Sequence, residues 1–228
     1  MKEKEPLIKR PYFRLSCPKT LIFLTGAPLS GKSTIAPLVT SSIEGLTLQP
    51  MDIIRLLAQE VENVKPKSQR NPFVNLGSCD SYTLIGDGKY TPESLIQGYN
   101  TYAEAVSSLL TGIIPKLEAQ GVRDLLFEGV QLTPRIVAPY LDRNNRLIVI
   151  TSNRSMLASN RKKVFGENKE LLDRYSDDKL LAIQQEILLQ AKQLSQDKVL
   201  YIENTGEYTD AATKVVRILS ETDIIQPL

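Results

Sequence analysis

The feature that most constrains this chain is the segment Gly26-Ala-Pro-Leu-Ser-Gly-Lys-Ser-Thr34, which fits the pattern G-x-x-x-x-G-K-[S/T] without deviation. An apolar run over 20–25 precedes the segment, and a helix-forming stretch extends from it to about residue 43. Gly26 and Gly31 allow the backbone to wrap around an anion, so that its N–H groups point inward. The segment therefore predicts a strand, a phosphate-binding loop and a helix, in that order.

The loop also predicts ATP and Mg²⁺ as cofactors. Lys32 would place a positive charge between the β- and γ-phosphates, and the hydroxyl of Ser33 would ligate the metal. The alternative, a chance glycine turn ahead of a helix, is disfavoured by the strand and the helix that flank the pattern. The residues expected to bind the nucleotide from this loop are Gly26, Ala27, Ser30, Gly31, Lys32, Ser33 and Thr34.

Short apolar stretches alternate with helical stretches along the rest of the chain. Strands are expected at 20–25, 46–49, 124–128, 146–150 and 199–203. Helices are expected at 53–63, from Thr91 towards Gly121 with a kink at Pro115, and at 133–142, 155–165, 178–195 and 208–220. The near-continuous apolar runs are typical of parallel strands that are covered on both faces. The pattern predicts an α/β, nucleoside/nucleotide-kinase-like P-loop NTPase fold, an open parallel five-stranded sheet with helices on both faces.

The chain is expected to form one main domain. Residues 1–18 predict a polar leader, in which prolines discourage a helix, and residues 19–228 predict a single P-loop domain. Within that domain, 63–90 is the least regular stretch and predicts an insertion on the acceptor side of the pocket. The stretch at about 153–175, which contains a cluster of cations, predicts a lid.

The composition narrows the partners and the location. The net charge is only +2, which argues against nucleic acid as an obligate partner. The chain has no histidine, so a histidine base or metal ligand is excluded, and its two cysteines match no metal spacing. The start of the chain does not resemble a signal peptide, and no apolar run is long enough to span a membrane. We therefore expect a cytoplasmic protein; nothing in the sequence fixes its oligomeric state.

Two carboxylates fall where expected strands end, at the edge of a parallel sheet where ligands bind. Asp52 follows the strand at 46–49 and is our candidate for orienting or deprotonating the acceptor hydroxyl. Glu128 ends the strand at 124–128 and is our candidate for the metal and its water shell, or for binding an acceptor hydroxyl. The alternatives are a helix N-cap for Asp52 and an exposed strand-end charge for Glu128.

A cluster of cations follows the fourth expected strand, where small P-loop kinases carry a mobile lid. Arg154 and Arg161 are seven residues apart and share one face of the expected helix. We expect Arg154 to bind the nucleotide and Arg161 to neutralise charge on the transferred phosphoryl group. A solvated basic helix face is the alternative. Arg55, one turn after Asp52, would bind an anionic acceptor; the alternative is an ordinary surface arginine.

Several segments together resemble the 2-phosphoglycerate kinase family of P-loop proteins. They are the phosphate loop, Asp52-Ile-Ile-Arg55, the helix over 99–121, Phe127-Glu-Gly-Val-Gln-Leu-Thr-Pro134, and a tail with Arg174-Tyr175, Ile183-Gln-Gln-Glu186 and Ile202-Glu-Asn204. The resemblance covers nearly everything from about residue 20 to 220. It implies ATP-dependent phosphorylation of a hydroxyl on a small, already phosphorylated acid, in the family's case giving 2,3-bisphosphoglycerate.

One position departs from the family's pattern. The family typically reads Glu-Gly-Val-His, whereas the fourth residue here is Gln131. A glutamine can hydrogen-bond an acceptor but cannot take its proton. We therefore expect Gln131 to bind the substrate together with Asp52, Arg55 and Glu128. If the family's histidine moves a proton, either Asp52 does that work here or the substrate differs.

These observations predict an ATP-dependent phosphotransferase with an alcohol group as acceptor. The chain is short and lacks the guanine-reading Asn-Lys-x-Asp element, which disfavours motor ATPases and GTPases. Two alternatives remain open: a nucleoside, nucleotide or polynucleotide-end kinase, and a non-catalytic ATP-binding regulatory protein. The expected partners are ATP and a small anionic acceptor. The expected catalytic residues are Lys32, Asp52, Glu128 and Arg161.

Overall fold

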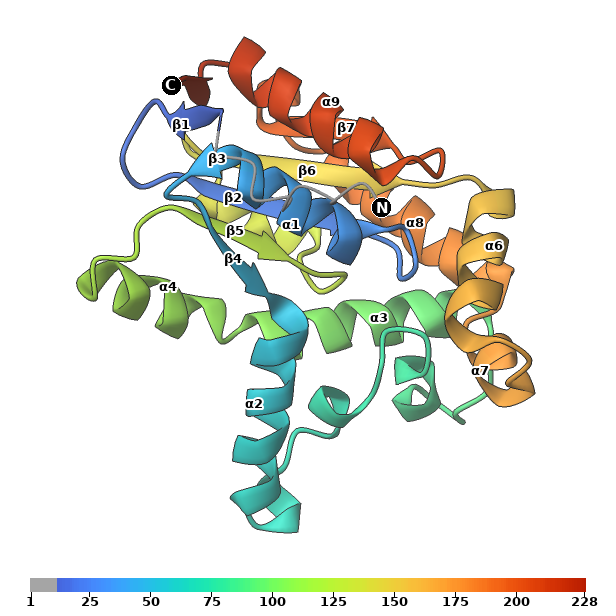
Figure 1. Cartoon of the computed structure of the whole chain (residues 1–228). Coiled ribbons are helices and arrows are strands. Elements are labelled where there is room, and N and C mark those ends of the chain that lie inside the picture. The colour runs from blue at the N-terminus through green and yellow to red at the C-terminus, as the bar shows by residue number, and fades with distance from the viewer. Residues whose placement is uncertain (1–11) are drawn as a thin grey trace, which may run out of the picture.

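The computed structural model describes residues 12–228, and its centre is a sheet of five parallel strands in the order β4-β5-β2-β6-β7 (Figure 1). Each strand begins and ends within one residue of its expected range. Because all five are parallel, their carboxyl ends meet at one edge, where ligands bind in such sheets. The bounds are β2 Leu21–Gly26, β4 Thr47–Pro50, β5 Leu125–Glu128, β6 Arg146–Thr151 and β7 Val199–Glu203.

Helices cover both faces of this sheet, as the sequence predicts. Successive strand residues point to opposite sides, so Ile22 and Leu24 enter one core and Phe23 enters the other. Helices α1 and α9 pack on the first face, and α3, α4 and α8 pack on the second. Their bounds are α1 Lys32–Ser42, α9 Tyr208–Glu221, α3 Pro92–Ser107, α4 Leu110–Ala119 and α8 Asp177–Ala191.

The long helix breaks earlier than the sequence predicts. We expected the interruption at Pro115, but Pro115 lies inside α4, and the break falls at residues 108–109 between α3 and α4. Ser108 competes with the helical hydrogen bonds there, because its hydroxyl donates to the carbonyl of Ala105, three residues earlier. Pro115 therefore does not end the helix.

A second, smaller sheet was not predicted. Strand β1 (Phe13–Leu15) pairs in parallel with β3 (Ile43–Glu44) and antiparallel with β8 (Ile225–Pro227). Of the expected leader at 1–18, the structure thus places 13–15 in a sheet, while residues 1–11 lie outside the described part of the chain.

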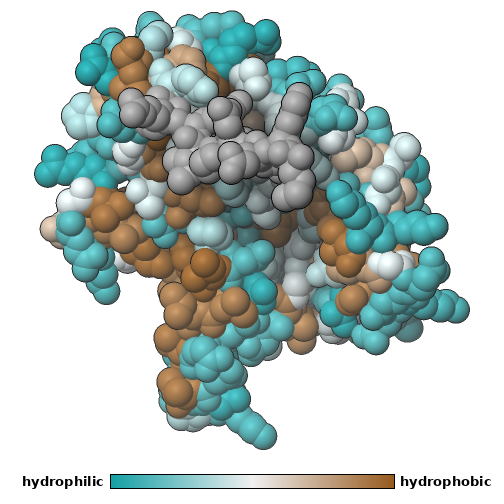
Figure 2. All heavy atoms as spheres, in the orientation of Figure 1, coloured by the Kyte–Doolittle hydropathy of each residue, from teal (hydrophilic) through white to brown (hydrophobic). Residues whose placement is uncertain are grey.

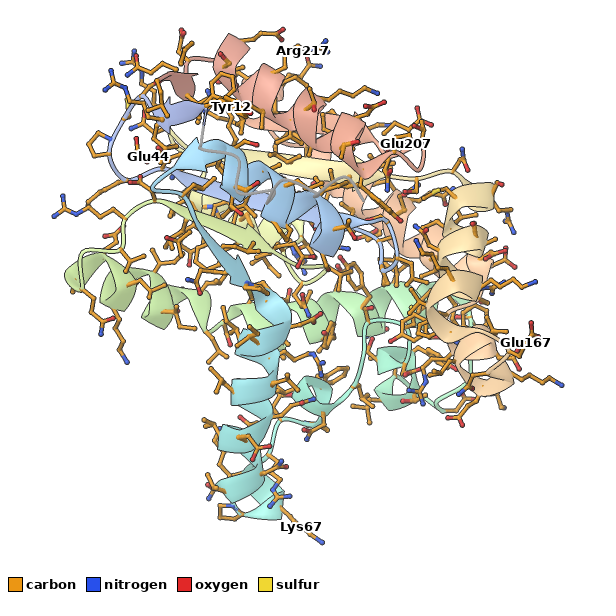
Figure 3. All side chains as sticks on the ribbon, viewed as in Figure 1. Tyr12, Glu44, Lys67, Glu167, Glu207 and Arg217 are labelled. Atoms are coloured by element: carbon orange, nitrogen blue, oxygen red, sulfur yellow. The ribbon has the colours of Figure 1, made fainter. Side chains whose placement is uncertain are left out.

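Two structures extend from the sheet's carboxyl edge. Helix α2 (Met51–Val64) projects from the body, and α6 (Arg154–Phe165) and α7 (Lys169–Arg174) form a corner on another side (Figure 1). The labelled Lys67 and Glu167 lie at the outer tips of these two projections (Figure 3). Figure 2 shows apolar surface along α2, where the exposed side chains are Ile53, Leu56, Leu57, Val61 and Val64.

The stretch between α2 and α3 contains only short turns, in line with the irregular sequence there. These are η1 (Lys67–Gln69), η2 (Pro72–Asn75) and η3 (Ser81–Leu84). The remaining short elements are α5 (Pro134–Val137), η4 (Ala138–Tyr140) and η5 (Gln196–Lys198). Within the described residues, no helix combines the length and apolarity that a membrane crossing requires.

Candidate active site

The phosphate loop connects β2 to α1, and its two glycines are required by its geometry. Gly26 has φ +153°, and a side chain there would collide with the carbonyl of Ile150 on the neighbouring strand. Gly31 has φ +94°, and a side chain there would collide with Asn204 and Tyr208. Only glycine combines these backbone angles with so little space. The loop can therefore approach a ligand with its backbone N–H groups, followed directly by the N-terminus of α1.

Lys32 lies at the base of this loop. It is 6% exposed, and its ammonium donates to the carbonyl of Ala27 at 2.8 Å. Burial lowers the pKa of Lys32, while the carboxylates of Glu128 and Asp52 raise it. Of the three protons on this ammonium, the described residues accept only one, so the others remain available for the oxygens of a bound phosphate.

Ser33 and Glu128 form the polar centre of the site. The Ser33 hydroxyl donates to Glu128 Oε1 at 3.2 Å. Glu128 is 6% exposed, so the alternative of an exposed strand-end charge is wrong. Burial raises the pKa of the Glu128 carboxyl, and the Lys32 ammonium opposes that rise. A buried carboxylate is costly, and its position beside Lys32 and Ser33 is the arrangement expected of a functional group.

These oxygens fit a magnesium ion. Mg²⁺ prefers hard oxygen ligands and usually keeps only one or two from the protein, with phosphates and waters completing the shell. Ser33 Oγ and Glu128 Oε1 offer two such oxygens within 3.2 Å of each other at the mouth of the loop. Across the described residues, no group of three or more acidic or cysteine side chains gathers as a self-sufficient metal cage. This donor set suits a metal that arrives with a nucleotide.

Side chains that follow β7 or lie on α6 and α9 hold the loop in place. Asn204 donates to the carbonyl of Ser30 at 2.8 Å, and Asn160 of α6 donates to that of Leu29 at 2.8 Å. Tyr208 in turn donates to Asn160. The sequence analysis assigned no role to these residues, although Asn204 follows a strand whose end points to the loop. Strand-end position was the signal that could have identified it.

A cavity of about 420 Å³ extends from the phosphate loop to helix α2. Its walls come from the loop, the first turn of α2, the stretch between α2 and α3, helix α3, the end of β5 and the corner at α6 and α7. The charged side chains that line it are Lys32, Asp52, Arg55, Asp80, Glu128 and Arg174. Cations and carboxylates are thus equal in number, and they line one cavity next to the loop.

Asp52 and Arg55 enter this cavity from the first turn of α2. The helix begins at Met51 with Pro50 as its N-cap, so the alternative N-cap role for Asp52 is wrong. Arg55 Nε lies 3.7 Å from Asp52 Oδ1, and both side chains line the cavity. Arg55 is therefore not an ordinary surface arginine. The two residues present a carboxylate and a guanidinium to whatever occupies the far end of the cavity.

Gln131 lies behind Asp52 and does not line the cavity. Gln131 is fully buried. Its amide nitrogen donates to Asp52 Oδ1 at 3.2 Å and to the Tyr102 hydroxyl at 2.7 Å. Any influence of Gln131 on an acceptor therefore passes through these two neighbours.

Helix α3 holds the loop that carries Gln131. Tyr99 donates to the carbonyl of Val130 at 2.8 Å, and Ser107 donates to the carbonyl of Gln131 at 3.0 Å. A Cβ at Gly129 would lie 2.5 Å from Gln131 Oε1 and 2.6 Å from Met51 Cβ. Glycine at this position lets the loop pass closely beneath α2, which brings Asp52 and Gln131 together.

The corner at α6 and α7 contributes a different arginine from those expected. Arg154 pairs with Asp178 at 2.8 Å, and Arg161 donates to the carbonyls of Leu172 and Tyr175. Neither lines the cavity. Both arginines share one face of α6, as expected, but that face packs against α7 and the start of α8.

Arg174, at the end of α7, lines the cavity instead. Its Nε lies 3.1 Å from Asp80 Oδ2, on the opposite wall. The sequence analysis selected neither Asp80 nor Tyr102 as site residues. Both lie outside any local motif, so only the folded chain brings them to the site.

The sheet order and this loop define the chain as a P-loop NTPase fold of the α/β class. Shikimate kinase from Acinetobacter baumannii in complex with shikimate has a similar fold, with a TM-score of 0.50 and 14% identity over 88% of this chain and 93% of that chain. A gluconokinase from Sinorhizobium meliloti 1021 aligns with a TM-score of 0.48 and 10% identity over 89% of this chain and 93% of that chain.

Identities this low establish the likeness of the fold alone. At the level of sequence, the chain matches no protein-family model and no curated protein. The particular resemblance to the 2-phosphoglycerate kinase family therefore stays a prediction.

Proposed function

We propose that this protein is an ATP-dependent kinase that transfers the γ-phosphoryl group to a hydroxyl of a small, anionic, 2-phosphoglycerate-like acid. One observation carries the proposal. A single cavity joins Lys32 and Ser33 of the phosphate loop to Asp52 and Arg55 of α2. A donor site and an acceptor site in one cavity are what direct phosphoryl transfer requires, because reacting groups must be held in line and in contact.

In this proposal the residues divide the work by position. Lys32 and the loop amides hold the phosphates, and Ser33 and Glu128 hold Mg²⁺, which neutralises charge on the transferred group when bound. Asp52 orients the acceptor hydroxyl and accepts its proton. Arg55 binds the acceptor's anionic group. Residues 153–175 serve as the lid, and Arg174 takes the role that the sequence suggested for Arg161, because Arg174 lines the cavity.

The direct test is a transfer assay with purified protein, ATP, Mg²⁺ and a panel of acceptors. The panel contains 2-phosphoglycerate, other small acids with a hydroxyl, nucleosides, nucleotides and 5′-hydroxyl oligonucleotides. We expect transfer to a small anionic acid. We also expect Lys32→Ala to lower turnover by at least about 100-fold, as loss of a charge-stabilising donor does, with the fold intact by circular dichroism.

Three outcomes would contradict the proposal. Phosphorylation of nucleosides, nucleotides or oligonucleotides alone would place the enzyme in a different substrate class. Tight ATP binding without turnover on any acceptor would indicate a regulatory nucleotide-binding protein. Wild-type rates in Lys32→Ala would show that the loop does not act on the nucleotide.

A further inference from the structure

The amide of Gln131 has a fixed orientation, which follows from its neighbours. Its nitrogen lies 3.2 Å from Asp52 Oδ1 and 2.7 Å from the Tyr102 hydroxyl. An ionised carboxylate only accepts hydrogen bonds, so it must face the N–H₂ group rather than the amide oxygen. Turning the amide over would place two acceptor oxygens in contact. In the observed orientation the buried Oε1 of Gln131 has no hydrogen-bond partner among the described residues. The amide keeps this orientation although an unpaired buried oxygen costs free energy.

This orientation determines what the Tyr102 hydroxyl can do. One N–H of Gln131 is directed to Asp52 and the other to Tyr102, so the phenol oxygen accepts. The phenol proton is then left for another partner, and within the described residues the Tyr102 hydroxyl donates to none. Burial raises the pKa of Tyr102, so the phenol keeps its proton at neutral pH. The result is a neutral hydrogen-bond donor without an acceptor in the described part of the chain.

The position of this donor points to a ligand. Tyr102 is 2% exposed and lines the cavity, as do Asp52 and Arg55. The Gln131 amide binds both Asp52 and Tyr102, and Arg55 Nε lies 3.7 Å from Asp52 Oδ1, so the three groups converge. A donor and a guanidinium beside a carboxylate suit a molecule with an oxyanion next to a hydroxyl.

We infer that Tyr102 is a specificity-determining residue that donates to an oxyanion of the acceptor beside Arg55, and that Gln131 is the positioning residue that directs this donor and Asp52. This inference rests on the proposed function, and it specifies which group of the acceptor binds at the α2 end of the cavity. The oxyanion is a carboxylate or a phosphate, and it occupies the space between the Tyr102 hydroxyl and the Arg55 guanidinium, while the acceptor hydroxyl faces Asp52.

The test is isothermal titration of the full chain with three probes, with and without saturating Mg·ADP. The probes are 2-phosphoglycerate, glycerate with only the carboxylate, and glycerol 2-phosphate with only the phosphate. We expect Tyr102→Phe to weaken the tightest probe about tenfold, the loss of one hydrogen bond to a charged group, and to leave Mg·ADP affinity unchanged. If Tyr102→Phe weakens the binding of glycerate but not of glycerol 2-phosphate, Tyr102 contacts the carboxylate. The opposite result assigns the contact to the phosphate.

Tyr140→Phe is the matched control. The Tyr140 ring packs against Phe23, and Tyr140 does not line the cavity. The variant loses a phenol hydroxyl but no ligand contact and no contact with the loop of Gln131, so probe affinity should change by less than about twofold. Equal weakening by both variants would show that Tyr102 acts only through the structure, and would overturn the inference.

Gln131→Glu tests the positioning role. The new carboxyl would share a proton with Asp52, because two carboxylates in contact do not both ionise. Its other oxygen would accept the Tyr102 proton, so the pocket would lose its donor. We expect probe affinity to fall about tenfold, with no further loss when Tyr102→Phe is added, because the two changes remove the same interaction. In the transfer assay, the acceptor KM should rise in Tyr102→Phe while kcat changes little, whereas Gln131→Glu should change both.

The outcomes separate this inference from the proposed function. If a probe binds as expected but no phosphoryl transfer occurs, the oxyanion site stands and the kinase proposal fails. If wild-type protein transfers phosphate but Tyr102→Phe binds every probe normally, the kinase stands and the inference fails. Wild-type protein that binds none of the three probes would also overturn the inference.

Discussion

Leu29 shows how one residue of the phosphate loop is forced into place. It has φ +64°, a left-handed conformation that costs a leucine roughly 1–2 kcal/mol. The Asn160 hydrogen bond to its carbonyl holds it there. We therefore predict that Leu29→Gly is more stable than Leu29→Ala by about 1 kcal/mol, the reverse of the ordinary order. Urea denaturation of both variants measures this; equal stability, or a more stable alanine variant, would show that the loop relaxes when the side chain is removed.

Asp52 allows a test that separates chemistry from binding. Asp52→Asn keeps the size of the side chain but removes the proton-accepting carboxylate. We expect turnover to fall by about 100-fold or more, while ATP affinity changes little, because Asp52 lies at the acceptor end of the cavity. Steady-state kinetics and nucleotide titration measure the two effects. The control is Asp87→Asn, whose carboxylate pairs with Lys89 outside the cavity. Parallel losses of turnover and affinity in Asp52→Asn would assign Asp52 a structural role.

For individual site residues, the sequence predicts those that belong to a local motif and does not predict those whose position depends on how the helices pack. Lys32 and Ser33 belong to a contiguous motif, and the structure places both at the phosphate loop, with Ser33 bonded to Glu128. The choice between Arg161 and Arg174 depends on how α6 and α7 turn after residue 165. Nothing in the spacing of the arginines encodes that turn.

Among the helices, α3 contains a glycine that is explained by packing. A Cβ at Gly98 would lie 2.5 Å from the Ser81 carbonyl carbon and 2.5 Å from the Tyr82 nitrogen, which are backbone atoms. Gly98→Ala should therefore destabilise the protein by about 1–3 kcal/mol, although alanine favours helices. Gly112→Ala in α4 is the control: nothing lies within 4 Å, so it should stabilise the protein by up to about 1 kcal/mol. Thermal denaturation of the two variants should shift in opposite directions, and shifts of the same sign would contradict the close approach of the insertion to α3.

A carboxylate at the end of α2 makes stability pH-dependent. Glu62 accepts hydrogen bonds from Lys65 Nζ and from the backbone of Asn71, and these bonds lower its pKa. A carboxyl whose pKa is lower in the folded state contributes its full stabilisation to the protein when the pH is above the ordinary pKa of 4.5. This contribution is lost as the pH falls through the pKa of the folded state. We predict that Glu62→Gln lowers stability at pH 7 and that its difference from wild type shrinks below pH 4. Glu60→Gln, on the exposed face, should show no such dependence.

The strands were easier to predict than the pairings between short segments. Apart from β4, whose sequence is Thr-Leu-Gln-Pro, the strands of the large sheet are largely apolar runs between turn signals, and such runs are visible in the sequence. The sheet of β1, β3 and β8 uses two or three residues per strand, taken from places far apart in the chain. Strands this short have no periodicity to detect, so their pairing emerges only when the main domain folds.

On the scale of the whole molecule, the two segments that form opposite walls of the cavity, at 63–90 and 153–175, contact each other. Arg174 pairs with Asp80, and Lys179 of α8 lies 4.7 Å from the ring centre of Tyr82 and 5.4 Å from that of Tyr90. Asp80, Tyr82 and Tyr90 belong to the insertion expected at 63–90, and Arg174 to the lid expected at 153–175. The Arg174–Asp80 ion pair joins these two segments directly, and the Lys179 contacts join the insertion to α8. A partly exposed ion pair contributes up to about 1 kcal/mol, and a cation–π contact about 0.5–2 kcal/mol.

This coupling predicts how the molecule responds to ligands. Non-hydrolysable Mg·ATP analogue and 2-phosphoglycerate together should slow amide hydrogen exchange in residues 153–175 and 75–90 at once, because each wall limits the opening of the other. Lys179→Met removes the cation between the two tyrosines, so the protection of 75–90 should fall relative to that of 153–175. Residues 13–15 of the small sheet lie outside the cavity lining and should exchange alike in all states. Protection confined to the phosphate loop, with both walls unchanged, would show that residues 153–175 are a fixed wall and not a lid.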